Sequence, residues 1–284
     1  MFRKYYALTK PGIIYGNVMT AAAGFLLASK WRIDWGLLAA TLVGTSLVIA
    51  SACVFNNYID RGIDAKMART RKRALVEGSI AAQNALVYAV VLGIVGFMIL
   101  ALYVNALVVV IGAVGIVDYV VLYGITKRRF VAGTIVGSVS GAMPVVAGYC
   151  AVTGRFDLGA TLLFIILALW QMPHFYAIAM YRHDDYKAAG LPVLPVKKGM
   201  RAAKLQIVTY IVAFTVVCAL LAVFGYTGFV YLAVTVATGA YWLFSGLRDF
   251  GTDNSVRWGR KMFGVSLLVI LTLSAALAVG SILP

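Results

Sequence analysis

The sequence predicts an all-α integral membrane protein with nine transmembrane helices. Of its 284 residues 62% are hydrophobic and the mean hydropathy is +0.92, which is too apolar for a soluble domain. A spanning helix needs about 20 mostly apolar residues, and nine runs are of about this length. No stretch between them is long enough for a soluble domain, so residues 1–284 are expected to form a single polytopic membrane domain. The runs cover residues 13–29, 36–55, 84–103, 105–125, 132–152, 158–181, 205–224, 228–247 and 262–282.

The basic residues predict the orientation of these helices. If alternate loops are assigned to one side of the membrane, starting with the N-terminus, that side receives 22 of the 25 Lys and Arg. The other side receives only Lys30, Arg32 and Arg155. By the positive-inside rule the N-terminus is predicted to be cytoplasmic, and nine spans place the C-terminus outside. The net charge of +15 is therefore a topology signal, and no soluble module is present that would bind nucleic acid.

The first run, residues 13–29, is interpreted as a transmembrane helix. Ala21-Ala22-Ala23 could mimic a cleavage site, but eight further spans follow, so a cleaved signal peptide is the weaker interpretation. The three cysteines, Cys53, Cys150 and Cys218, all lie inside predicted spans without metal-ligand spacing. We expect them to pack in the core.

The second run ends in a polar cluster, Asn56-Asn57-Tyr58-Ile59-Asp60-Arg61-Gly62-Ile63-Asp64. Asn56, Asp60 and Asp64 are spaced by four residues, so they line one face if the helix continues past the membrane surface. Two carboxylates one turn apart suit Mg²⁺, which would keep water or phosphate oxygens as further ligands. The alternative is a solvated loop in which the aspartates pair with their basic neighbours. Asn57, Arg69 and Arg73 are the diphosphate-binding candidates in this segment.

The fourth run, residues 105–125, ends next to a second group of candidates. Tyr123 and Lys127 share a helix face, so both could reach a diphosphate bound at the first cluster. Asp118 lies about two turns deeper and has no obvious partner in the sequence, so it could line a pore, be paired or be protonated. The fifth run is rich in Gly, Ser and Ala, which permit close helix packing.

The sixth run, residues 158–181, carries ionisable groups inside the membrane. Gln171 and His174 lie one turn apart near its end. Pro173 lies between them, and a proline inside a helix removes a backbone hydrogen bond and predicts a kink. An intramembrane histidine is a functional candidate by default, and the alternative is a neutral histidine satisfied by a neighbouring helix. Arg182, His183, Asp184 and Asp185 follow at the boundary. The two aspartates could form a second metal site, or Asp184 could be solvated and only Asp185 used.

These groups together suit the chemistry of an allylic diphosphate. Breaking the carbon–oxygen bond is easier when Mg²⁺, Lys and Arg neutralise the departing diphosphate. The carbocation-like centre must then be kept from bulk water, which a membrane bundle with aromatic walls can do. The predicted topology places the charged groups at the cytoplasmic rim and leaves the hydrocarbon region for a lipid tail.

The motifs carry a resemblance to a known family. The pattern Asn-x-x-x-Asp-x-x-x-Asp at Asn56, Asp60 and Asp64, with an acidic loop after the sixth span, resembles the UbiA superfamily of intramembrane prenyltransferases. Within it, Trp170-Gln171-Met172-Pro173-His174-Phe175 and the segment from Tyr186 to Val196 look like the protohaem IX farnesyltransferases, or haem O synthases. The resemblance runs from Thr9-Lys10-Pro11-Gly12 onward and covers nearly the whole chain.

The resemblance implies a fold, a reaction and a set of roles. It implies a UbiA-type bundle in the bacterial inner membrane, with the active-site loops in the cytoplasm. The implied reaction transfers the farnesyl group of farnesyl diphosphate to a vinyl group of haem B, with addition of water, and gives haem O and diphosphate. The implied cofactor is Mg²⁺, and a haem A synthase or terminal oxidase would receive the product.

Several residues match the family pattern. Asn56, Asp60 and Asp64 match the metal–diphosphate motif, and Tyr123 and Lys127 match a Tyr-x-x-x-Lys element. At the second acidic motif this sequence has adjacent Asp184 and Asp185 in place of Asp-x-x-x-Asp, which leaves the number of Mg²⁺ ions open. Catalytic roles are expected for Asp60, Asp64, Lys127 and Tyr123. Arg182 is expected to contact the diphosphate, and His174, Gln171 and His183 are expected to contact the iron or the propionates of the haem.

Two other functions remain as alternatives. A prenyltransferase acting on an aromatic quinone precursor would share the acidic motif, but the Trp-Gln-Met-Pro-His segment argues against it. A secondary transporter would be expected to carry its acidic residues near the midplane of the membrane. Here only Asp118 lies deep, and the other candidates cluster at one boundary.

Overall fold

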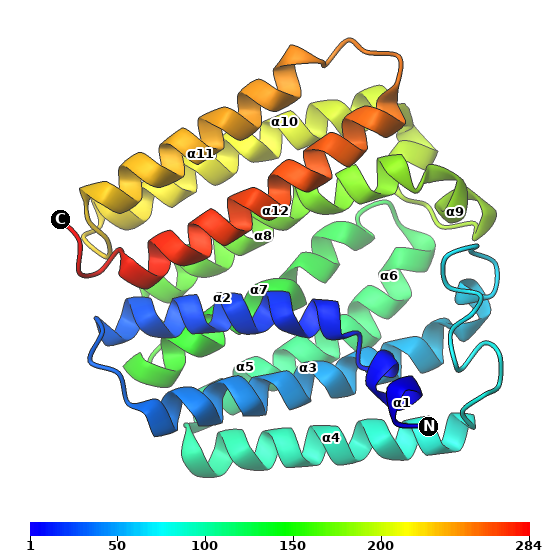
Figure 1. Cartoon of the computed structure of the whole chain (residues 1–284), viewed down its shortest axis with the longest axis horizontal. Coiled ribbons are helices and arrows are strands. Elements are labelled where there is room, and N and C mark those ends of the chain that lie inside the picture. The colour runs from blue at the N-terminus through cyan, green and yellow to red at the C-terminus, as the bar shows by residue number, and fades with distance from the viewer.

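Nine long apolar helices form the body of the computed structural model, which describes residues 1–284 (Figure 1). This confirms the predicted all-α class and the count of spans. The fourth span is built from three consecutive pieces, α5 (Ala106–Val117), η1 (Asp118–Leu122) and α6 (Tyr123–Arg129). Two short helices, α1 (Phe2–Leu8) and α9 (His183–Ala188), lie at one end of the bundle (Figure 1). The remaining helices are α2 (Pro11–Ser29), α3 (Trp35–Asp64), α4 (Ala82–Tyr103), α7 (Gly133–Thr153), α8 (Leu158–Tyr181), α10 (Leu194–Val223), α11 (Phe229–Arg248) and α12 (Ser255–Val279).

Three helices extend far beyond the predicted spans. Helix α3 continues from the predicted end at residue 55 to Asp64, and α12 begins at Ser255, before the predicted start at residue 262. Helix α10 begins at Leu194, before residue 205, and is kinked at Gly199, whose φ of 84° favours glycine. Hydropathy detects only the apolar part of a helix, whereas backbone hydrogen bonds continue beyond the membrane into polar sequence. The continuation of α3 confirms that Asn56, Asp60 and Asp64 belong to one helix.

Polar side chains fix the starts of three spans on the side with few basic residues. The carboxylates of Asp34 and Asp157 accept the backbone N–H groups of Leu37 and Ala160 at 2.9 and 3.1 Å. The side chain of Asn105 accepts from Val108 N–H at 2.9 Å. These caps satisfy N–H groups that a helix start leaves unpaired. They hold the turns at the end of the bundle opposite the candidate site.

Close packing of α2 against α7 brings two backbones into direct contact. A Cβ atom added at Gly148 would lie 1.9 Å from Ala21 O, and one added at Gly24 would lie 2.2 Å from Val145 O. Small residues permit this approach, which is a common way for membrane helices to associate. The pairing of α2 with α7 holds one wall of the cavity described below.

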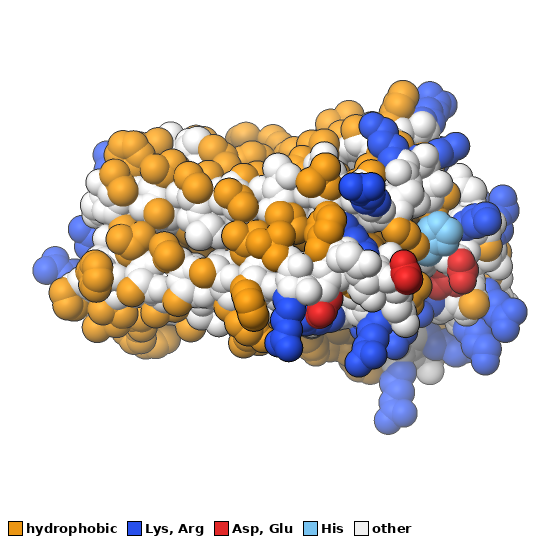
Figure 2. All heavy atoms as spheres, turned by 90° about the horizontal axis from the view of Figure 1, so that it is seen from above, with side chains coloured by type: hydrophobic (Ala, Val, Ile, Leu, Met, Phe, Trp, Pro, Cys, Tyr) orange, Lys and Arg blue, Asp and Glu red, His pale blue; other side chains and the backbone are white.

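Charged side chains gather at one end of the molecule (Figure 2). In that view the acidic and histidine side chains and most of the Lys and Arg lie at the right-hand end, while hydrophobic side chains cover much of the rest of the surface. The right-hand end is also where α1, α6 and α9 lie in Figure 1. The one-sided distribution of charge that the sequence predicted is therefore present in three dimensions.

Candidate active site

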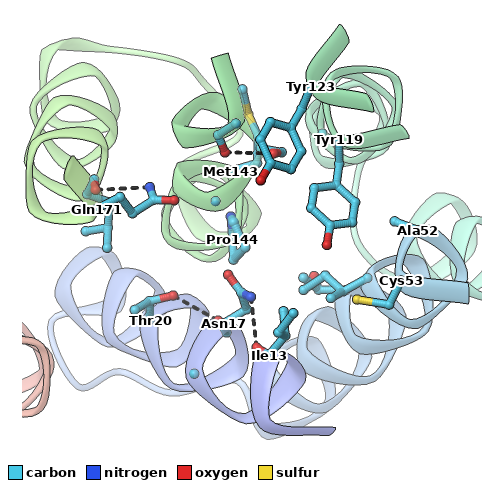
Figure 3. A pocket seen from close by; sticks show the side chains of 18 of the residues that line it. Ile13, Asn17, Thr20, Ala52, Cys53, Tyr119, Tyr123, Met143, Pro144 and Gln171 are labelled. Atoms are coloured by element: carbon cyan, nitrogen blue, oxygen red, sulfur yellow. Dashed lines mark hydrogen bonds between the residues drawn. The ribbon is translucent and has the colours of Figure 1, made fainter. Parts of the chain in front are cut away.

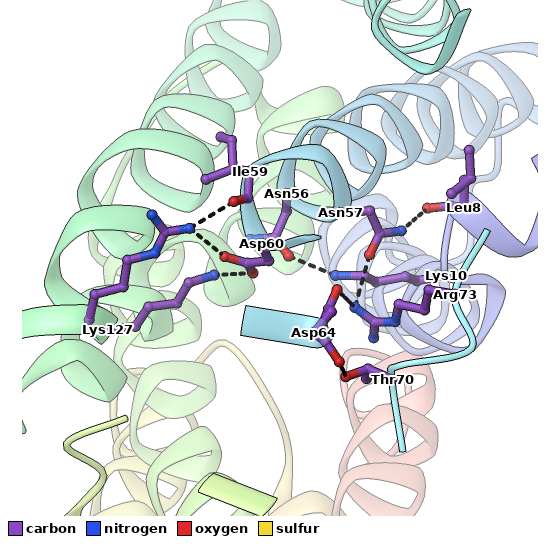
Figure 4. Close-up of polar contacts among 11 residues, drawn as sticks. Leu8, Lys10, Asn56, Asn57, Ile59, Asp60, Asp64, Thr70, Arg73 and Lys127 are labelled. Atoms are coloured by element: carbon purple, nitrogen blue, oxygen red, sulfur yellow. Dashed lines mark hydrogen bonds and ion pairs between the residues drawn. The ribbon is translucent and has the colours of Figure 1, made fainter. Parts of the chain in front are cut away.

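The first acidic cluster lies on one face of the last turns of α3 (Figure 4). Asn56, Asp60 and Asp64 are all buried, with 3%, 9% and 3% of their surfaces exposed. Gly62 does not interrupt the helix. A solvated loop is therefore wrong, because these side chains are buried on a helix. The pairing of both aspartates with basic residues, which that alternative included, is present.

Two basic residues of α6 neutralise Asp60. Lys127 Nζ forms a short ion pair with Asp60 Oδ2, and Arg128 Nη2 contacts Oδ1 at 2.9 Å. Arg128 also donates to Ile59 O at 2.9 Å. The carboxylate thus joins α3 to α6, and its two oxygens are held in a fixed orientation.

Asp64 has its own basic partner in the segment that follows α3. Arg73 Nη1 lies 2.6 Å from Asp64 Oδ2 and 3.0 Å from Asn57 Oδ1 (Figure 4). Asn57 Nδ2 in turn donates to Leu8 O at 2.8 Å. Thr70 Oγ1 donates to Asp64 O at 2.9 Å. These contacts fold residues 65–81 back over the end of α3.

Lys10 completes the basic group from the start of α2. Its Nζ donates to Asn56 Oδ1 at 2.7 Å. Burial, with Arg73 and Lys127 adding to it, lowers the pKa of Lys10 to about 8. The Nδ2 group of Asn56 is buried without any hydrogen-bond partner. A buried N–H donor beside four cationic side chains and two carboxylates is suited to an anionic oxygen.

A cavity of about 430 Å³ lies inside the bundle, next to the polar rim formed by Lys10, Asn56, Asp60, Asp64, Arg73, Lys127 and Arg128 (Figure 3). The rim residues do not line the cavity themselves. Its wall is mostly apolar and is formed chiefly by residues of α2, α3, α5, α7 and α8. Helices α4, η1, α6, α9 and α12 add one or two residues each, among them Tyr186 of α9. Asn17 and Thr20 of α2 add a few polar groups, and Met143 and Pro144 of α7 form the opposite side (Figure 3). An elongated apolar substrate with a charged head could place its head at the rim and its tail in this space.

Two tyrosines stand between the rim and the cavity. The rings of Tyr119 and Tyr123 are stacked at 5.8 Å, and both line the cavity (Figure 3). Lys127 Nζ lies 4.9 Å from the centre of the Tyr123 ring, as the shared helix face predicted. Tyr123 is placed here because η1 is a π-helix in which its N–H bonds to Asp118 O, one residue further back than in an α-helix. Aromatic faces at this position can stabilise a cationic centre.

Asp118 has a partner that the sequence did not reveal. Its Oδ2 accepts the backbone N–H of Ser140 on α7 at 2.9 Å, and the residue is only 3% exposed. Of the three possibilities considered from the sequence, the structure favours a paired carboxyl.

His174 and Trp170 form the wall of the cavity on α8. The two rings are stacked at 4.7 Å, and His174 Nδ1 lies 2.8 Å from Ser266 Oγ on α12. Gln171 also lines the cavity, but its Nε2 donates to Ser138 O at 3.1 Å and Leu167 O at 3.0 Å. One N–H group therefore joins α8 to α7 and the other is used within α8, so only the carbonyl oxygen of Gln171 remains for a ligand.

The second acidic pair is divided between two environments. Asp185 Oδ1 accepts the backbone N–H of Ala68 at 3.2 Å, so it connects α9 to the segment after α3. Asp184 is fully exposed and contacts only His183, at 3.2 Å.

The other predicted rim contacts lie at the surface. Arg69 and Arg182 are exposed, and the Arg182 guanidinium lies 5.2 Å from the Tyr181 ring. His183 does not line the cavity.

The donor set of the rim suits a hard cation. No group of three or more His, Cys, Asp or Glu comes together, but Asp60 and Asp64 provide carboxylate oxygens one helical turn apart. Mg²⁺ is commonly bound through one or two carboxylates together with substrate phosphates. The residues present fit that mode of binding. Asp184, in contrast, points to solvent.

The sequence interpretation missed three residues of this site. Lys10 and Arg128 were counted only among the 22 basic residues that predict the orientation. Tyr119 was not singled out. A basic residue directly before Pro11 at the start of a span was the available signal for Lys10, since it must lie at the same membrane boundary as Asn56. The contact itself depends on the tertiary fold.

The sequence of the chain matches a known family over most of its length. Residues 17–277 match the UbiA prenyltransferase family. The chain belongs to this family. It is 53% identical to protoheme IX farnesyltransferase 2 of Chromobacterium violaceum, over 100% of this chain and 94% of that protein. It is 52% identical to protoheme IX farnesyltransferase of Escherichia coli strain K12, over 100% of this chain and 96% of that protein.

Solved structures share the fold of this UbiA family member. A digeranylgeranylglyceryl phosphate synthase aligns with a TM-score of 0.80 at 18% identity, covering 99% of this chain and 98% of that one. A UbiA homologue from Archaeoglobus fulgidus bound to GPP and Mg²⁺ aligns with a TM-score of 0.69 at 16% identity, covering 96% of this chain and 99% of that one. The expected UbiA-type bundle is therefore confirmed.

Proposed function

We propose that the chain transfers the farnesyl group of farnesyl diphosphate to a vinyl group of haem B, with addition of water, and so forms haem O and diphosphate. The observation that carries the proposal is the identity of 52–53% over the full chain to proteins named protoheme IX farnesyltransferase. The basic rim and the apolar cavity are consistent with it. They suit a substrate with a diphosphate head and a long hydrocarbon tail.

The basic rim binds and orients the diphosphate in this proposal. Lys10, Lys127, Arg128 and Arg73 surround the two carboxylates, and Asn56 Nδ2 offers an unused N–H donor. A Mg²⁺ ion held by Asp60 and Asp64, as one is bound in the Archaeoglobus fulgidus homologue, would neutralise charge on the diphosphate oxygens. If such an ion replaced Lys127 as the partner of Asp60, the Lys127 ammonium would become available to the diphosphate.

Transfer then breaks the allylic carbon–oxygen bond, the π bond of the vinyl group and one O–H bond of water, and forms a carbon–carbon bond and a carbon–oxygen bond. The carbon–oxygen bond of the allylic diphosphate breaks, and its electron pair leaves with the diphosphate. The terminal vinyl carbon of haem B attacks the allylic carbon, while Tyr119 and Tyr123 present aromatic faces to the developing positive charge. The cation left next to the macrocycle takes the oxygen of water, and one proton is released. Exclusion of water from the first step depends on the apolar wall of the cavity.

The proposed location is the bacterial inner membrane, with the active-site rim facing the cytoplasm. The positive-inside rule supports this orientation, because 22 of the 25 Lys and Arg belong to that side in the nine-span arrangement. The diphosphate substrate would enter from the cytoplasm. Membrane lipid would surround the apolar surface, and a haem A synthase or terminal oxidase would use the product.

The test uses purified protein in lipid with haem B, farnesyl diphosphate and Mg²⁺. The products are separated by chromatography and identified by mass. We expect a haem O product that depends on Mg²⁺ and is lost in Asp60→Asn and Asp64→Asn. Asp249→Asn is the matched control, because Asp249 pairs with Lys261 on the surface, away from α3.

Other outcomes would replace the proposal. Prenylation of an aromatic acid, without any haem product, would keep the family and overturn the acceptor. No transfer to any acceptor by folded protein would favour the transporter alternative.

A further inference from the structure

His174 is held in one orientation by the rings around it. Trp170 stacks on its ring at 4.7 Å with an angle of 26° between the planes. Phe263 of α12 lies at 5.0 Å with an angle of 40°, and Phe175 approaches edge-on at 5.4 Å. A side chain held on several sides loses little further freedom when it binds a ligand. This is the arrangement expected of a preorganised contact in the cavity wall.

The hydrogen bonds of Ser266 determine which nitrogen of His174 carries the proton. Ser266 Oγ lies 2.6 Å from Phe263 O, and a carbonyl oxygen can only accept. The single hydroxyl hydrogen of Ser266 is therefore used in that bond. At the 2.8 Å contact with His174, the serine oxygen must accept, so the proton lies on Nδ1.

This tautomer leaves Nε2 of His174 with a free lone pair. The only protein group that hydrogen-bonds to the His174 ring is Ser266, through Nδ1. A propionate oxygen is an acceptor and needs an N–H donor, which this Nε2 does not provide. A neutral imidazole nitrogen is, however, a common ligand of haem iron. The hydrogen bonding thus discriminates between the two haem contacts considered from the sequence.

We infer that His174 Nε2 is the axial ligand of the iron of the haem B substrate, and that Ser266 is the positioning residue that holds His174 for this role; the inference rests on the proposed function. The coordinate bond forms from the nitrogen lone pair, so no proton is released and the iron is neither oxidised nor reduced. Histidines that ligate metals usually donate their other ring N–H to a protein acceptor, as His174 does to Ser266.

Ser266 also anchors the ring that backs His174. Trp170 Nε1 donates to Ser266 O at 3.0 Å. The backbone and the side chain of one fully buried residue therefore hold both members of the stacked pair. Because α12 provides Ser266 and α8 provides the two rings, the ligand is fixed by the packing of these helices.

The experiment measures the iron–histidine stretching band of the ferrous haem B complex by resonance Raman spectroscopy, using the full-length protein in lipid nanodiscs. The chain has only two histidines, so His183→Ala is the control for His174→Ala. We expect the band in wild type and in His183→Ala. It should be absent in His174→Ala and return when imidazole is added to that variant.

Ser266→Ala tests the positioning role. Loss of the Nδ1 acceptor should keep the band but move it to lower frequency, and should weaken haem B binding several-fold. Ser274→Ala is the matched control, because Ser274 is a buried serine of α12 whose hydroxyl has no partner. We expect it to leave the band unmoved.

The outcomes separate this inference from the proposed function. A band lost in His174→Ala supports the ligand assignment whether or not haem O forms. No such band in wild type, or an unchanged band in His174→Ala, overturns the assignment even if haem O is made. An unmoved band in Ser266→Ala overturns the role of Ser266. Failure of wild type to make haem O counts against the proposed function alone.

Discussion

Lys127 illustrates at the scale of single residues how the site is prepared for an anion. It forms a buried ion pair with Asp60, while Arg128 holds the other oxygen of the same carboxylate. Burying a charge without a partner costs free energy. In the absence of substrate, Asp60 and its basic partners therefore stabilise one another. A diphosphate with its metal can take over these partners, because it supplies both negative and positive charge. The site is therefore stable before binding and complementary to substrate during it.

Substitution of Lys127 tests whether this lysine acts on the substrate directly or only adds to the positive charge of α6. We expect Lys127→Met to lower kcat/KM for farnesyl diphosphate about 100-fold, the magnitude typical of losing one preorganised group that stabilises developing charge. The control is Arg129→Met, two residues away in the same helical turn, which is exposed and makes no ion pair. Steady-state kinetics of both variants in lipid would check this. Equal losses in the two variants would show that only the overall positive charge of α6 matters.

At the scale of the helices, the π-helical turn η1 decides where the tyrosines lie. It adds one residue to the turn between Asp118 and Tyr123, and Asp118 ties this turn to α7 through Ser140 N–H. Irregular turns of this kind often occur at functional sites. Here the irregular turn brings Tyr119 and Tyr123 to the cavity and leaves Lys127 within reach of Asp60.

Asp118 is expected to act as a hydrogen-bond acceptor that stabilises this junction. Asp118→Ala would remove the acceptor that ties this turn to Ser140 N–H on α7, so we expect a loss of about 1 kcal/mol in stability. Asp118→Asn keeps an acceptor oxygen and should lose less. Thermal unfolding of both variants in detergent, followed by circular dichroism, measures the difference. If Asp118→Asn were as unstable as Asp118→Ala, a negative charge would be needed at this position.

The helices also show which parts of the site the sequence could predict. Asn56, Asp60 and Asp64 share a face because of their spacing, and so do Tyr123 and Lys127; both are local properties of a helix. The contact of Lys10 with Asn56 joins residues 46 positions apart, and His174 with Ser266 joins residues 92 apart. No periodicity in the sequence encodes such pairs. The π-helical turn was missed because the one residue that it adds to the backbone leaves no signature in the hydropathy of the span.

At the scale of the whole molecule, the fold separates two environments along one axis. The charged rim lies at one end (Figure 2), and the mostly apolar cavity lies inside the bundle, where Tyr119 and Tyr123 form the part of its wall next to the rim (Figure 3). A substrate with a charged head and an apolar tail can satisfy both only in one orientation. The composition of the sequence predicted this polarity, whereas the shape of the cavity depends on close contacts such as that of Gly148 with Ala21.

The orientation of that axis across the membrane can be tested directly. The three native cysteines are 0–1% exposed, so they give little background in labelling with a membrane-impermeant maleimide. Arg155 lies in the turn between α7 and α8 with a side chain that is 77% exposed, and Asp253 lies in the exposed turn between α11 and α12. These two turns belong to opposite ends of the nine-span arrangement. In intact spheroplasts we expect labelling of Arg155→Cys, and labelling of Asp253→Cys only after the membrane is permeabilised. The reverse pattern would place the rim outside the cell. This would contradict the positive-inside rule, because the side that carries 22 of the 25 basic residues would then be external. Cytoplasmic delivery of the diphosphate would then be ruled out.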